Sequence, residues 1–69
     1  MSELWLTEAQ YMNKVFLQHK AGKRLWRVKI DEDSAWIYHE YDNYDEALSK
    51  FERIAHMQWI LVFKTLNNK

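Results

Sequence analysis

Cysteine is absent from this chain of 69 residues, and glycine occurs only once. Without cysteine the chain can form no disulfide, no thiolate metal site and no thiol nucleophile, and the absence fits a reducing compartment. The single glycine excludes the glycine-rich loops that bind phosphate, because such loops need several glycines. These absences exclude several common kinds of catalytic and binding site.

Long apolar runs are also missing. The longest one, residues 59–63, is far shorter than the roughly 20 residues that cross a bilayer. The first residues have neither the basic start nor the apolar core of a signal peptide. We therefore expect no membrane span and a cytoplasmic protein, located in the host cytoplasm if the chain is viral.

Aromatic residues are plentiful, with four Trp, four Tyr and three Phe among 48% hydrophobic residues. Large aromatic side chains are the densest source of buried area for a short chain, and this content argues against disorder. We expect one compact domain spanning residues 1–69, with a frayed tail at about residues 67–69.

The charges are balanced in number but unevenly placed along the chain. Residues 9–30 contain six basic residues and no acid, whereas residues 31–52 contain eight acids and one lysine. This division predicts oppositely charged surfaces, which steer partners more than they determine the fold.

Residues 44–57 have the clearest pattern in the chain and are predicted to form a helix. Apolar side chains recur at helical spacing, as at Ala47, Phe51 and Ile54, and polar side chains occupy the other side. Asn43 and Glu46 have the spacing of a capping box, which places the helix start at Tyr44.

A hairpin is predicted before this helix, with strands at residues 24–30 and 35–41 joined by the polar turn 31–34. The length of that turn suggests that Ile30 faces Ala35. The outer face of the hairpin would then carry two basic and two aromatic side chains, and we predict that these four bind a partner: Arg27, Lys29, Trp36 and Tyr38.

Residues 8–20 allow two interpretations. Thr7 and Gln10 have the form of a capping box, and Gly22 could end a first helix that starts at about Glu8. Residues 15–17 could instead be a strand that enters a hairpin. We take the helix as the prediction, and the strand remains the alternative.

Residues 58–66 are predicted to form a last strand at a sheet edge, and apolar side chains would lie on both faces of this strand. An apolar edge invites pairing, so either residues 4–6 cover it or the protein forms a homodimer through Trp59, Leu61 and Phe63. The predicted fold is α+β: a three-stranded antiparallel sheet with two helices packed on one face, in the order helix, strand, strand, helix, strand.

No arrangement of residues indicates chemistry. His19, His39 and His56 have no metal-ligand spacing, and the serines lie in no nucleophile motif. We predict no enzyme activity, no metal site and no cofactor.

The predicted function is therefore binding. We expect a small protein-interaction module or inhibitor that binds another protein through its aromatic and charged sheet face, of the kind that viruses and mobile elements often encode. The alternative is a single-stranded nucleic-acid-binding protein that uses the same four residues, with bases stacked on the rings and cations at phosphate. The acids between residues 31 and 46 offer a further possibility, mimicry of phosphate groups.

Overall fold

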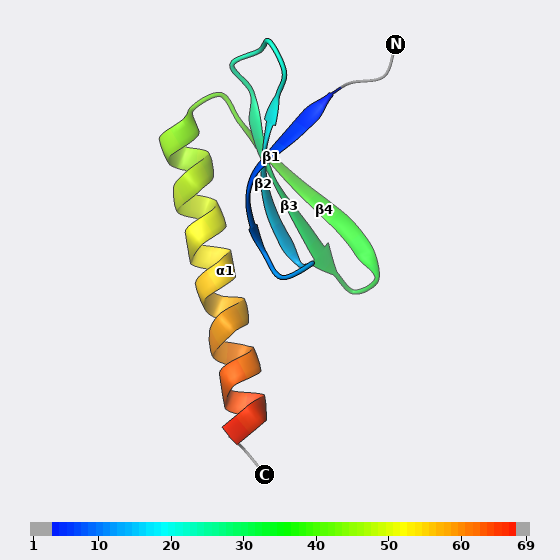
Figure 1. Cartoon of the computed structure of the whole chain (residues 1–69), viewed down its shortest axis with the longest axis vertical. Coiled ribbons are helices and arrows are strands. Elements are labelled where there is room, and N and C mark those ends of the chain that lie inside the picture. The colour runs from blue at the N-terminus through cyan, green and yellow to red at the C-terminus, as the bar shows by residue number, and fades with distance from the viewer. Residues whose placement is uncertain (1–3, 68–69) are drawn as a thin grey trace.

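The described residues form four strands followed by one long helix (Figure 1). This computed structural model describes the backbone of residues 4–67 and the side chains of residues 4–59. The elements, in chain order, are β1 (Trp5–Tyr11), β2 (Val15–Lys20), β3 (Trp26–Glu32), β4 (Ala35–Tyr41) and α1 (Tyr44–Asn67).

The prediction of a three-stranded sheet with two helices is wrong, because the first helix is absent and the chain begins with two strands. The alternative interpretation, a strand over residues 15–17, matches β2. Val15 and Leu17 are fully buried while Phe16 between them is only partly buried, which is the alternation of a strand. The apolar residues between 8 and 20 fit the spacing of a helix as well as that of a strand. Packing against the rest of the sheet therefore decides for the strand.

The predicted last strand is also wrong, because residues 58–66 continue α1. Neither glycine nor proline occurs after residue 57 to end the helix. Trp59, Leu61 and Phe63 therefore lie on a helix and form no sheet edge. Asn67 is the last residue of α1, and residues 68 and 69 of the predicted frayed tail lie outside the described residues.

The four strands form one antiparallel sheet in the order β1-β2-β3-β4, so each strand pairs with its neighbour in the chain. The predicted hairpin of β3 and β4 is confirmed, but its register differs from the prediction by two residues. Ile30 pairs with Ile37, because Asp33 and Ser34 form a two-residue turn with φ of 51° and 64°. A shift of two residues leaves every side chain on its expected face.

The predicted start of the central helix is confirmed at Tyr44. The Asn43 side-chain oxygen accepts a hydrogen bond from the backbone N–H of Glu46 at 3.2 Å, as an N-cap residue does. Asp45 and Glu46 then place negative charge in the first turn, where the helix dipole favours it.

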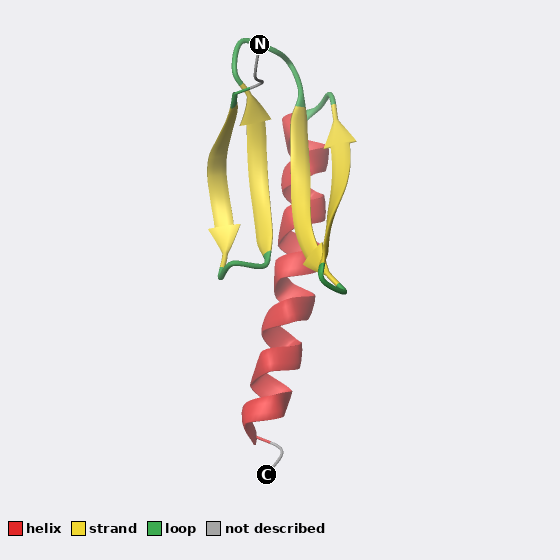
Figure 2. Cartoon of the chain, turned by 90° about the vertical axis from the view of Figure 1, so that its right-hand side faces the viewer, coloured by secondary structure: helices red, strands yellow, loops and turns green. Residues whose placement is uncertain are grey.

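The core lies between α1 and one face of the sheet. Six buried apolar side chains from β2, β3 and α1 form it: Val15, Leu17, Val28, Ile30, Ala47 and Phe51. Figure 2 shows the helix behind this face, running past the end of the sheet toward the C-terminus. A helix of 24 residues is about 36 Å long, whereas a strand of seven spans about 23 Å, so only the first part of α1 can cover the sheet.

Candidate interaction surface

The sheet face opposite α1 is covered by no described element, and we call it the open face (Figure 2). The four residues predicted to bind a partner, Arg27, Lys29, Trp36 and Tyr38, all lie on it. Arg27 and Lys29 alternate with the buried Val28 along β3, and Lys29 pairs with Tyr38 across the hairpin. The structure therefore brings these four side chains together, while their binding role stays a prediction.

Arg27 is held at the centre of the open face. Its guanidinium carbon lies 4.1 Å from the centroid of the Trp5 ring and 4.6 Å from that of Tyr38. Its Nε donates a hydrogen bond of 2.7 Å to the side-chain oxygen of Gln18, and the Gln18 amide donates in turn to the Thr7 hydroxyl at 3.2 Å. Gln18 is only 8% exposed, so this polar chain is built into the sheet. The guanidinium thus has a fixed position between two rings.

Lys29 makes a second contact of the same kind beside it. Its Nζ lies 4.4 Å from the centroid of Trp36 and 5.5 Å from that of Phe16. The two rings meet edge to face at 5.8 Å, a favourable arrangement for aromatic pairs. Lys20 lies further out, with its Nζ 6.0 Å from the Trp5 ring.

Two residues of this surface were missed by the sequence analysis. Trp5 and Phe16 come from β1 and β2, and Phe16 fell within the segment predicted to be helical. The alternation of residues 15–17 was the available signal, because it puts Phe16 opposite Val15 and Leu17. Nothing in the sequence indicated that Trp5 would reach Arg27, since that contact joins β1 to β3 across β2.

The open face is aromatic and mixed in charge. Trp36 and Tyr38 are 43% and 46% exposed, which is high for rings this large. The strand alternation and pairing place Asp31 and Glu40 on the same face, beside the cations of Arg27 and Lys29. The surface therefore combines large rings with charges of both signs.

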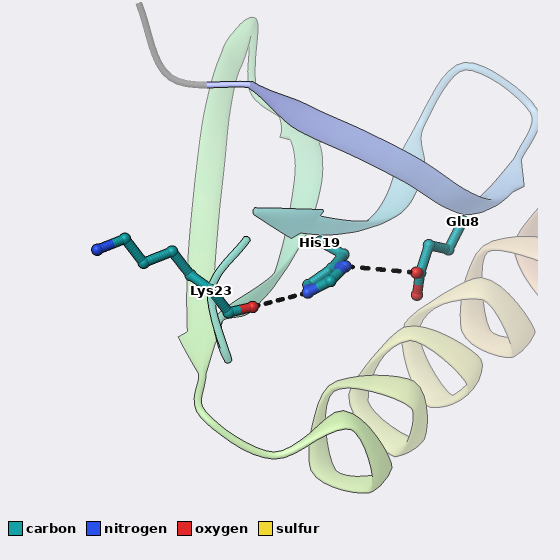
Figure 3. A network of polar contacts seen from close by, with 3 residues as sticks. All are labelled: Glu8, His19 and Lys23. Atoms are coloured by element: carbon teal, nitrogen blue, oxygen red, sulfur yellow. Dashed lines mark hydrogen bonds and ion pairs between the residues drawn. The ribbon is translucent and has the colours of Figure 1, made fainter. Parts of the chain in front are cut away.

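On the opposite side of the sheet, His19 joins three parts of the chain (Figure 3). Its Nε2 lies 2.7 Å from the carbonyl oxygen of Lys23, and since a carbonyl can only accept, Nε2 carries the hydrogen. Its Nδ1 lies 3.7 Å from the carboxylate of Glu8, at the bulge in β1, and its ring stacks on Trp26 at 4.8 Å. The hydrogen bond and the stacking connect β2 to the turn before β3 and to the start of β3, with Glu8 of β1 beside the ring, which is a structural role.

Metal-ligating residues do not gather in the described part of the chain, where no group of three or more His, Asp or Glu could hold an ion. Likewise, no helix among the described residues is both long enough and apolar enough to span a membrane. The absence of enzyme activity, metal and cofactor stays a prediction.

The residues predicted to mediate self-association lie on the overhanging part of α1. Trp59 is 50% exposed, and its ring stacks on His56 with centroids 6.3 Å apart. The side chains of Leu61 and Phe63 lie outside the described part of the structure. A homodimer stays a prediction, but an edge strand made of these residues does not exist.

Comparison with known proteins gives no relative, because no family model, no curated protein and no solved structure matches the chain.

Proposed function

We propose that this chain is a non-enzymatic protein-interaction module that binds its partner through the open face. The observation that carries the proposal is the fixed position of Arg27 between the rings of Trp5 and Tyr38. Tryptophan, tyrosine and arginine are the residues that contribute most to binding energy at protein interfaces.

The order already present in the open face supports this proposal. Arginine loses considerable conformational entropy when an interface immobilises it. Here two rings and the hydrogen bond to Gln18 hold Arg27 before any partner arrives. The Arg27 side chain therefore loses little further conformational entropy when a partner binds.

A protein partner suits this surface better than a nucleic acid does. Arg27 and Lys29 already occupy part of the ring surface on which bases would need to stack. The chain has no net charge, and Asp31 and Glu40 lie beside the cations, which weakens attraction to phosphate. Aromatic and charged side chains of both signs are what protein interfaces use.

Inhibition is one form that such binding can take. A module of 69 residues that occupies another protein's surface would block that surface without any chemistry of its own. The suggestion of a viral or mobile-element origin rests on small size and the lack of motifs alone.

Site-specific photo-crosslinking tests the proposal. A photoreactive phenylalanine analogue replaces Trp36 on the open face, and in a control chain it replaces Glu52, an exposed residue of α1. We expect the Trp36 position, but not the Glu52 position, to crosslink one protein in an extract of the source cells. Arg27→Ala should weaken binding of that purified protein at least tenfold. Equal crosslinking from both positions, or an unchanged affinity for the Arg27→Ala chain, would contradict the proposal.

Single-stranded nucleic acid is the second candidate, and the interleaved cations and rings are the observation that favours it. Tryptophan fluorescence separates the two candidates, because Trp5 and Trp36 both lie on this surface. If nucleic acid is the partner, an oligonucleotide should quench the fluorescence at low salt and lose that effect at high salt. We expect no change at either salt concentration.

A further inference from the structure

The two edges of the sheet differ in how well they are protected. The outer edge of β1 is interrupted by a bulge between Thr7 and Ala9, a device that discourages pairing with another strand. β4 has no such feature: all seven of its residues pair regularly with β3, and it contains neither proline nor lysine. Its outer backbone groups have no partner strand among the described elements.

The helix side of this edge is hollowed. A depression of about 360 Å³ lies between the sheet and α1, and it is lined by the apolar Ile30, Ile54 and Met57 and by the polar Glu32, His39, Lys50 and Gln58. Two apolar side chains beside it are open to solvent, Ile37 at 38% and Met57 at 57% exposure. An added strand would place alternate side chains directly over this depression.

The chain segment that forms this edge is acidic, and two cations of other elements lie beside it: Lys29 of β3 contacts the Trp36 ring, and Lys50 of α1 lines the depression. Residues 31–46 run from the end of β3 through β4 to the start of α1, and they contain seven acids and no lysine or arginine. The acids stand at both ends of the strand, with Glu32 and Asp33 before it and Asp42 and Asp45 after it. This arrangement attracts a positively charged segment.

We propose that β4 accepts an extended segment of another protein as a fifth strand of the sheet. The segment carries lysine or arginine near its ends, opposite the acids, and apolar side chains at alternate positions that enter the depression beside Met57. Backbone hydrogen bonds to β4 provide affinity, and the depression and the acids provide selectivity. This site is distinct from the open face and does not depend on the proposed function of that face.

A second copy of this chain is a poorer occupant of the same edge. Antiparallel pairing of two β4 strands would bring the acids that precede one strand close to those that follow the other. Like charges placed opposite each other destabilise strand pairs, so self-pairing works against the charge that favours a basic segment.

A titration of the isotope-labelled protein with short peptides, followed by amide NMR signals, tests this inference. One peptide has seven residues, with valine at alternate positions and lysine at both ends, and its counterpart has glutamate in place of lysine. We expect the lysine peptide to shift the amide signals of β4 and slow their exchange with solvent. The glutamate peptide should bind at least tenfold more weakly.

Variants at the two edges make the test specific. Ile37→Lys and Leu6→Lys each add a lysine at an exposed apolar position, the first on β4 and the second on β1. Ile37→Lys should abolish binding of the lysine peptide, while Leu6→Lys should leave it unchanged. Glu32→Lys should reduce the preference for lysine over glutamate. The spectrum of each free variant shows whether it is folded.

Three results would overturn the inference. The first is an absence of shifts in β4 at millimolar concentrations of the lysine peptide. The second is equal loss of binding from Ile37→Lys and Leu6→Lys. The third is concentration-dependent dimerisation that Ile37→Lys abolishes, since this would show that a second copy occupies the edge.

Discussion

Arg27 connects the stability of this protein with its proposed binding. Its side chain contacts Trp5 from one edge strand and Tyr38 from the other, and it donates a hydrogen bond to Gln18 of β2. In this position it covers part of two large rings and remains available to a partner. One side chain thus makes an uncovered aromatic face compatible with a folded monomer.

Replacing Arg27 should therefore lower stability as well as binding. Arg27→Ala removes two ring contacts, each worth about 0.5–1 kcal/mol, and a hydrogen bond worth about 1 kcal/mol. We expect the free energy of unfolding in urea to fall by about 2–3 kcal/mol. Arg27→Lys keeps the charge but loses the planar stacking, so its effect should be smaller. An unchanged midpoint for Arg27→Ala would show that the stacked arrangement contributes nothing in solution.

At the scale of elements, local signals differ in how strongly they determine structure. The hairpin and the helix start were predictable, because alternation at Trp26, Val28 and Ile30 and the cap at Asn43 are local features. Residues 8–20 and 58–66 were assigned wrongly, because their apolar residues fit both periods. Residues 8–20 form the end of β1 and all of β2, because as strands they can pair with each other and with β3. Residues 58–66 continue the helix because no glycine or proline in the sequence ends α1.

The same distinction applies to the candidate surface. The face shared by Arg27, Lys29, Trp36 and Tyr38 was predictable, since an error of two residues in register preserves the faces. The contacts of Trp5 and Phe16 were not, because they depend on strands that the sequence analysis did not assign.

Two substitutions in the turn between β3 and β4 should stabilise the protein. Asp33 and Ser34 both have positive φ, a conformation that asparagine and glycine adopt more easily. A chain with Asp33→Asn and Ser34→Gly should gain about 0.5–1 kcal/mol in free energy of unfolding, measured by urea denaturation. Ser34→Ala is the matched control and should lose stability. A loss of stability in the double variant would contradict the two-residue turn.

At the scale of the whole molecule, the described residues form one helix and four strands, and their buried side chains make a small core on the helix side of the sheet. A domain of this length is expected to be stable by roughly 3–10 kcal/mol. Among the described residues, the six buried side chains between the sheet and α1, with the partly buried apolar side chains packed against them, supply a large part of this stability. The open face adds the contacts of Arg27, and the far end of α1 extends past the sheet.

Substitution in this core should accordingly affect the entire fold. Leu17 is fully buried, so Leu17→Ala should lower the free energy of unfolding by about 3 kcal/mol, within the usual range of about 2–5 kcal/mol. Leu6→Ala is the control, because Leu6 is 47% exposed and its loss should cost under about 1 kcal/mol. Similar losses from both variants, measured in urea, would contradict the location of the core.

The central claim is that one face of the sheet is open and carries an ordered aromatic surface. Relaxation of NMR signals by a soluble gadolinium chelate tests it most directly, because the chelate broadens only protons that solvent can approach. The account predicts strong broadening of the Trp36 indole N–H and the Tyr38 ring, and little effect on the methyl groups of Leu17 and Val28. Protection of Trp36 and Tyr38 to the level of Leu17 would show that the face is covered in the free protein, and would contradict its assignment as a binding surface.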